Sequence, residues 1–278
     1  MRRAHLVGLA ACAWLAASLP AQAVVLRYSP KVGSITKHKM TMAGRMETTT
    51  DVLPEPMRME ITGSMAYTEK VLSETADTAR VETTTTGGQV TLKMAGESQS
   101  QDMPKTRMVA DMDRRGRVVK LVEGDVGGEK VASSVLGAGP ESLSFSNFGT
   151  FPEGEVNVGD VWSDEVRVPA TKETPEIRLK VNSRLLELTT VGGRECAKIR
   201  TNFRGPITVT LGEEEGGGTV NASLEGDVMW FYDHENSLYV SGEGTVGMDM
   251  RMSVAAPGMP GVEMTSKMLM NMKIALAE

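Results

Sequence analysis

The sequence predicts a mainly β fold: two repeats of long antiparallel strands that form an open or half barrel, with one short helix near residues 128–138. Apolar residues recur at every second position over much of the chain, which is the period of a half-buried strand. Clusters of Gly, Pro, Asn and Asp interrupt this alternation, as turns do. Two short motifs each occur once in either half of the chain, which indicates an internal repeat.

The first repeat, about residues 24–125, should be a series of hairpins. Its expected strands occupy residues 34–47, 57–67, 80–86, 89–94, 106–112 and 117–122. Gly87-Gly88 should make one hairpin turn, and the polar stretch Gly96–Lys105 should be a loop. In the last hairpin Asp113 begins the turn and Gly116 takes a left-handed conformation, which suits a type I turn with a bulge.

A helix and loop, residues 126–150, should join the first repeat to the second, about residues 151–278. Gly139-Pro140 is expected to end the helix. The expected strands of the second repeat occupy residues 160–168, 176–190, 195–203, 207–211, 219–232, 238–252 and 263–276. Both repeats are expected to belong to a single β-rich domain, residues 24–278.

The repeat depends on two pairs of motifs. Residues 30–34 (PKVGS) match residues 156–160 (VNVGD), and residues 112–118 match residues 232–238, with Asn236 in the place of Gly116. Asn tolerates the left-handed conformation better than most residues do. The stretch Phe151–Trp162 therefore starts the second repeat, and we expect Trp162 to plug one end of the barrel.

The N-terminus predicts export. Arg2 and Arg3 precede an apolar stretch, and Ala21-Gln22-Ala23 fits a cleavage site, so residues 1–23 are expected to be a signal peptide. A lipobox ending at Cys12 is the competing interpretation, but Cys12 comes too early in the apolar stretch to favour lipid anchoring. The mature protein is therefore expected in the periplasm or outside the cell.

The net charge limits the kinds of partner that the protein can bind, and the cysteine content limits its disulfide bonds. Without the signal peptide the chain has 28 basic and 36 acidic residues, a net charge of about −8, which argues against nucleic acid and anionic membrane surfaces as partners. Cys196 is then the one cysteine of the sequence, so no internal disulfide can form. It lies in an alternating stretch, where a buried and inert thiol is expected.

Methionine is unusually frequent, at 20 of 278 residues, while aromatic residues make up only 4%. After Met1, the methionines fall between residues 40 and 112 and between residues 229 and 272, often at alternate positions that share one strand face. The side chains expected to line an apolar interior are Met40, Met42, Met57, Met59, Met65, Met108, Met112, Met248, Met250, Met252, Met268, Met270 and Met272.

Four interpretations of this methionine face remain open. Methionine can fill an irregular core, and it can also line a cavity that adapts to lipids or similar ligands. Thioethers suit Cu(I), and His38 shares a strand face with Met40 and Met42. The side chains can also act as a sink for oxidants.

The sequence contains no G-x-S-x-G, H-E-x-x-H, P-loop or C-x-x-C motif, and only His38 and His234 follow the signal peptide. Gly242–Gly247 matches G-x-G-x-x-G, but it lies within a strand alternation and precedes no helix, so it fails as a dinucleotide-binding motif. We expect no catalytic residues, no metal site, no cofactor and no enzymatic activity.

The residues Phe151-Pro152-Glu153-Gly154, the pattern V-x-V-G-D-x-W at residues 156–162 and the later Trp230-Phe231-Tyr232-Asp233 resemble a family of exported bacterial β-rich proteins with a domain of unknown function. The resemblance implies no catalytic residue. The expected architecture is also similar to the half-barrels of periplasmic lipoprotein carriers, although a shared fold does not imply a shared function.

These observations favour a non-enzymatic exported protein that binds a lipid or other apolar ligand in a methionine-rich concave interior. The alternative is a structural or interaction protein of the cell envelope with a filled core and a protein partner. Periplasmic Cu(I) binding through Met and His is a further alternative.

Overall fold

The computed structural model describes residues 23–126, 150–168, 177–211, 218–254 and 262–277. The predicted signal peptide and the predicted helix lie outside these ranges, apart from Ala23 at the end of the former. Within them the chain forms strands and turns only. The strands are β1 (Val24–Val25), β2 (Ile35–Thr50), β3 (Met57–Glu74), β4 (Thr78–Met94), β5 (Glu97–Asp102), β6 (Thr106–Asp113), β7 (Val118–Val126), β8 (Glu155–Val156), β9 (Val161–Val168), β10 (Ile177–Val191), β11 (Arg194–Leu211), β12 (Gly218–Asp233), β13 (Leu238–Val254) and β14 (Val262–Leu276).

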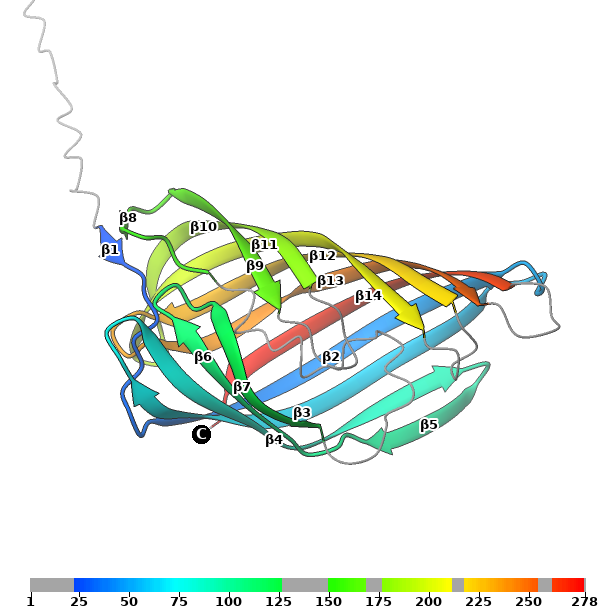
Figure 1. The fold of residues 1–278 in the computed structure, drawn as a ribbon, viewed down its shortest axis with the longest axis horizontal. Helices are drawn as coiled ribbons and strands as arrows, with labels where there is room; N and C mark the ends of the chain where they lie inside the picture. The colour runs from blue at the N-terminus through cyan, green and yellow to red at the C-terminus, as the bar shows by residue number, and fades with distance from the viewer. Residues whose placement is uncertain (1–22, 127–149, 169–176, 212–217, 255–261, 278) are drawn as a thin grey trace, which may run out of the picture.

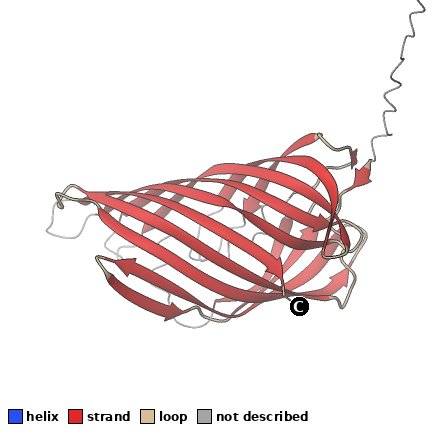
Figure 2. Cartoon of the chain, turned by 180° about the vertical axis from the view of Figure 1, so that it is seen from behind, coloured by secondary structure: helices blue, strands red, loops and turns tan. Residues whose placement is uncertain are grey.

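One large antiparallel sheet contains twelve of these strands, and it curls into an incomplete barrel (Figure 1). Its strands follow the order β7-β6-β4-β3-β2-β14-β13-β12-β11-β10-β9, with β5 paired to β4 beside this path. Figure 2 shows the unbroken wall of long strands from behind. The predicted mainly β half barrel is therefore confirmed.

The pairing of β14 with β2 joins the first and last long strands of the chain. It extends from Met264 opposite Thr50 to Leu276 opposite His38. Burial alternates along β14, with Met and Ile side chains inside and Lys, Asn and Glu side chains outside. Because side chains point to opposite faces at successive positions, this alternation defines an apolar inner face and a polar outer face.

One end of the barrel, which we call the plugged end, holds the turns at residues 31–34, 74–78, 113–117, 157–160 and 233–237. An aromatic cluster fills it. The ring of Phe151 lies 4.4 Å from that of Tyr232, and the ring of Tyr239 lies 5.3 Å from that of Trp230. Trp162 is buried in the same core, and its indole N–H donates to the carbonyl of Thr150 at 2.6 Å. Trp162 thus lies where the sequence predicts a plug.

The two turns that precede the first strands of the predicted repeats have matching hydrogen bonds. Gly33 N–H donates to Val71 O and Val71 N–H to Ser34 O; Gly159 N–H donates to Leu185 O and Leu185 N–H to Asp160 O. Both glycines have positive φ, 81° and 101°. The internal repeat remains a prediction, which this match supports.

Four local predictions are wrong. Gly87-Gly88 makes no hairpin: β4 continues through it with a bulge opposite Ala66 and Tyr67, where Gly87 adopts a φ of 141°. The predicted polar loop contains β5, which follows a tight turn at Ala95-Gly96. Strand β11 is continuous over the two strands expected there. In the late turn Ser237, rather than Asn236, has positive φ.

Glycines on the inner face make room for aromatic rings. A Cβ atom added to Gly226 would lie 2.2 Å from the Phe203 ring, and one added to Gly242 would lie 2.5 Å from the Trp230 indole. Each glycine pairs directly with the aromatic residue of the neighbouring strand. Gly242 is part of the G-x-G-x-x-G match, so packing against Trp230 explains this glycine.

Replacing Gly242 by Ala should destabilise the fold by about 1–3 kcal/mol, because the new methyl group overpacks the Trp230 ring. Gly247→Ala is the matched control on the same strand, since its Cβ would meet Glu225 Cγ at an ordinary 3.4 Å. Urea unfolding, followed by tryptophan fluorescence, measures the free energy of unfolding of both variants and of the wild type. Equal stability of the two variants would contradict the packing described for Gly242.

Candidate functional site

The inner face of four adjacent strands, β13, β14, β2 and β3, carries a continuous set of methionines, which we call the methionine band. Its members are Met40, Met42, Met46, Met59, Met65, Met248, Met250, Met268, Met270 and Met272. The centre of the band is one row across the sheet in which each residue lies directly opposite the next: Met248, Met268, Met46, Met59 and, on β4, Met94. Each of the five residues comes from a different strand. The row is therefore formed by strand pairing and cannot be seen in any one segment of the sequence.

The structure brings nine of the predicted lining residues into the band and places four elsewhere. Met57 and Met252 lie farther from the plugged end, beyond the central row, and Met57 is exposed. Met108 and Met112 lie on β6 opposite Thr83 and Ala79, with β4 between them and the band. Met46 was missed, although it follows the same alternation as Met40 and Met42.

Exposure of the side chains increases along the central row. Leu224, which begins the row on β12, is fully buried, whereas Met248 and Met268 are 4% and 8% exposed. The exposed fraction reaches 47% at Met94, on β4. The row therefore runs from the packed wall of the barrel to a solvent-exposed rim, and its apolar surface is continuous between them.

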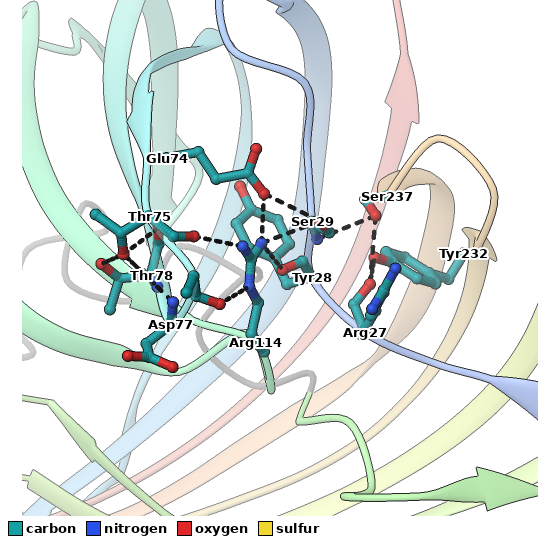
Figure 3. A network of polar contacts seen from close by, with 11 residues as sticks. Arg27, Tyr28, Ser29, Glu74, Thr75, Asp77, Thr78, Arg114, Tyr232 and Ser237 are labelled. Carbon is teal, nitrogen blue, oxygen red and sulfur yellow. Dashed lines mark hydrogen bonds and ion pairs between the residues drawn. The ribbon is translucent and has the colours of Figure 1, made fainter.

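A segment that we call the strap, residues 24–30, crosses the plugged end and bonds to both halves of the chain (Figure 3). Tyr28 N–H donates to Arg114 O at 2.8 Å. On the other side the Tyr232 hydroxyl donates to the carbonyl of Arg27 at 2.7 Å. The side chains of Leu26 and Tyr28, which belong to the strap, are buried. The strap thus closes this end with apolar side chains and fixes itself with polar contacts.

Arg114 is the centre of the contacts on one side of the strap (Figure 3). Its guanidinium group donates to Ser29 Oγ at 3.0 Å and to Glu74 Oε1 at 2.5 Å, and to two carbonyls of the turn that follows β3. The hydrogen bond from Arg114, with one from Ser29, lowers the pKa of Glu74 below its usual 4.5. An ionised Glu74 therefore helps to hold the strap.

The two outer edges of the sheet meet near the plugged end through charged side chains. Arg115 Nη2 lies 2.9 Å from Asp164 Oδ2, and Arg117 Nη1 lies 3.6 Å from Asp164 Oδ1. Arg115 and Arg117 belong to the turn between β6 and β7, whereas Asp164 lies on β9. Because β7 and β9 do not pair, these contacts connect the two edges there.

A polar group interrupts the apolar interior between the aromatic cluster and the methionine band. We call it the polar collar; it consists of Thr36, His38, Tyr67, Glu69, Thr83 and Thr85 on β2, β3 and β4. His38 stacks on Tyr67 with ring centroids 4.8 Å apart, and its Nε2 lies 3.7 Å from Glu69 Oε2. Sequence reasoning missed Glu69, because a single Glu in an alternating strand carries no signal of its own.

Tyrosine side chains surround Glu69. Burial, and then the negative charge of Glu69, raise the pKa of both Tyr28 and Tyr67 well above the usual 10.0. Burial, the neighbouring Tyr232 and Glu69 raise the pKa of Tyr239 in the same direction. These phenols therefore stay protonated at neutral pH and remain capable of donating hydrogen bonds.

Two hollows lie on the outer face of the barrel, with volumes of about 410 and 680 Å³. The smaller is lined mainly by polar residues such as Asn221, Asp249 and Lys267. The larger is lined by charged residues such as Arg45, Arg58 and Glu60 together with Met46, Met59 and Met268 of the central row. The larger hollow thus adjoins the central row of the methionine band.

Cys196 is buried, and burial followed by the nearby Asp233 raises the pKa of its thiol, as expected of an inert cysteine. In the described ranges no three His, Cys, Asp or Glu side chains gather where they could hold one metal ion. Nor does any helix there have the length and apolar character needed to cross a membrane.

Neither a protein-family model nor a curated protein matches this chain. The function is therefore inferred from the residues and their geometry.

Replacing Glu74 by Gln should reduce the loss of stability in acid. Because the pKa of Glu74 is lowered in the folded state, its contribution is present above the unfolded value of about 4.5 and is lost as the pH falls through the folded value. The melting temperature of the wild type should therefore drop more between about pH 6 and pH 2 than that of Glu74→Gln.

Glu60→Gln serves as the control, because it removes an exposed carboxylate whose partner is Lys93 Nζ at 3.4 Å. If Glu74→Gln and the wild type lost the same number of degrees over this interval, the role of Glu74 in holding the strap would be refuted.

Proposed function

We propose that this protein is a non-enzymatic exported carrier or receptor that binds a lipid or another apolar ligand against the methionine band. The observation that carries the proposal is the central row, in which five methionines lie side by side from the buried wall at Met248 to the exposed rim at Met94. An apolar chain held in this part of the interior would contact thioether side chains of the row and, along β2, those of Met42 and Met40.

The chemistry of methionine supports this proposal over a purely structural role. Its unbranched, polarizable side chain can adapt to ligands of varied shape, as other methionine-rich binding surfaces do. A barrel that only needed a core would be expected to use the β-branched and aromatic residues that strands prefer. This barrel uses them at the plugged end and over β10 and β11, where Ile177 and Ile207 are buried, and uses methionine mainly on β13, β14, β2 and β3.

We propose that the protein acts in the periplasm or outside the cell, because residues 1–23 have the pattern of a signal peptide. The net charge of about −8 does not favour direct adsorption to an anionic membrane, so the ligand is proposed to arrive as single molecules or from a protein of the envelope.

Protein purified from the envelope of an expressing bacterium should carry co-purified lipid, which native mass spectrometry detects as adducts. Met268→Gln should reduce these adducts at least about fivefold, because it places an amide in the apolar row. Leu269→Gln is the matched control, since the neighbouring Leu269 is exposed on the outer face of β14. Adduct-free wild-type protein would favour a structural protein with a filled core.

Cu(I) binding is the second candidate, and one observation favours it. His38 and Met40 lie on the inner face, Met65 lies opposite Met40, and His38 Nδ1 has no hydrogen-bond partner in the described part of the chain. An imidazole nitrogen with nearby thioethers is a donor set that Cu(I) accepts.

Competition with a Cu(I) chelator separates the candidates. If the protein is an apolar carrier, no saturable binding tighter than about 1 µM is expected. Binding at that level, lost when His38, Met40 and Met42 are replaced together, would instead establish the copper function.

A further inference from the structure

The polar collar contains an ionisable pair that is costly to bury. His38 is 2% exposed and the Glu69 side chain 17% exposed, and their cross-strand neighbours are Tyr67, Thr36 and Thr83. Removing a carboxylate from water costs free energy unless hydrogen bonds replace the lost hydration. Their separation of 3.7 Å is longer than a hydrogen bond, so the pair does not satisfy itself.

His38 keeps unused hydrogen-bonding capacity. His38 Nδ1 is buried without a partner among the described residues. Stacking on Tyr67 fixes the plane of the imidazole, so this nitrogen cannot easily turn away to find one. Buried polar groups normally have partners, and a group without one calls for an explanation such as a ligand.

The collar is adjacent to the methionine band. His38 and Met40 are successive inward-facing residues of β2, and Glu69, Tyr67 and Met65 are successive inward-facing residues of β3. On the other side the aromatic cluster and the strap close the barrel. An apolar chain that lay along β2, past Met42 and Met40, would therefore end at the collar.

We propose that Glu69 and His38 bind the polar head group of an amphiphile whose apolar chain lies along the methionine band. This inference rests on the proposed function and names the ligand class for it: a single-chain amphiphile whose head donates hydrogen bonds and carries no negative charge, such as a hydroxyl or an amine. The Glu69 carboxylate accepts from that head, and His38 supplies the second contact.

The charge of the Glu69 side chain determines which head groups the collar can bind. The Glu69 carboxylate repels a carboxylate or phosphate head, and the six collar residues include no Arg or Lys to offset this repulsion. A fatty acid should therefore bind more weakly than the alcohol of the same chain length, although the apolar contacts of the two are the same.

Equilibrium dialysis with radiolabelled 1-dodecanol and dodecanoate, each below its solubility or micelle limit, tests this inference. The wild type should bind dodecanol at least about tenfold more tightly. Glu69→Gln keeps the shape of the side chain and removes its charge, so it should reduce this ratio about tenfold, chiefly by tightening dodecanoate binding.

Two further variants complete the design. Glu60→Gln makes the same change in net charge on the outer face of β3 and should leave the ratio unchanged. His38→Phe keeps a ring against Tyr67 but removes both nitrogens, and should weaken dodecanol binding about fivefold. Thermal melts confirm that each variant is folded.

The outcomes separate the two proposals. If neither ligand binds, the carrier function fails and the head-group inference fails with it. If both ligands bind with equal affinity and Glu69→Gln changes nothing, the carrier function stands and the head-group inference is overturned. A wild-type preference for dodecanoate overturns the inference as well.

Discussion

The antiparallel pairing of β14 with β2 is the constraint on which the rest of the structure depends. It joins the last strand of the chain to its first long strand, so that two runs of sequential strands become one sheet with its free edges at β7 and β9. The same register places Met268 opposite Met46 and Met272 opposite Met42. The methionine band and the curvature of the barrel thus have a common origin in these hydrogen bonds.

Much of this fold follows from period-two alternation. The strands that contain Met40, Met268 and Trp230 were predicted because one buried face makes every second residue apolar. The failures lie where glycine is ambiguous: Gly87-Gly88 has the composition of a hairpin turn, but β3 continues beside it and imposes a bulge. Strand β5 is polar and exposed throughout, so its sequence shows no alternation to detect.

The sequence predicts that methionines line the candidate site, but it does not predict how methionines of different strands are arranged in it. Alternation placed Met40 and Met42 on one face, but only the pairing across β13, β14, β2, β3 and β4 shows that Met248 and Met94 belong to one row. Nothing in the sequence marks Glu69 as a site residue. It becomes a candidate only because the fold places its carboxylate 3.7 Å from the buried imidazole of His38. The inner face of β2 and β3 therefore changes from polar at the collar to thioether beyond it, whereas the inner face of β10 and β11 stays aliphatic at Ile177, Leu179 and Ile207.

The most direct test of this account is NMR of protein labelled with ¹³C at the methionine ε-methyl groups, titrated with 1-dodecanol. Saturable shifts are predicted for the inward methyl resonances of Met40, Met42 and Met272, which lie within about 13 Å of the collar along the strands. The resonance of Met229, which alternates with the inward-facing Val228 and Trp230 and so points outward from β12, should not move. Shifts confined to exposed methionines such as Met57, or no shifts at all, would contradict a ligand-binding interior.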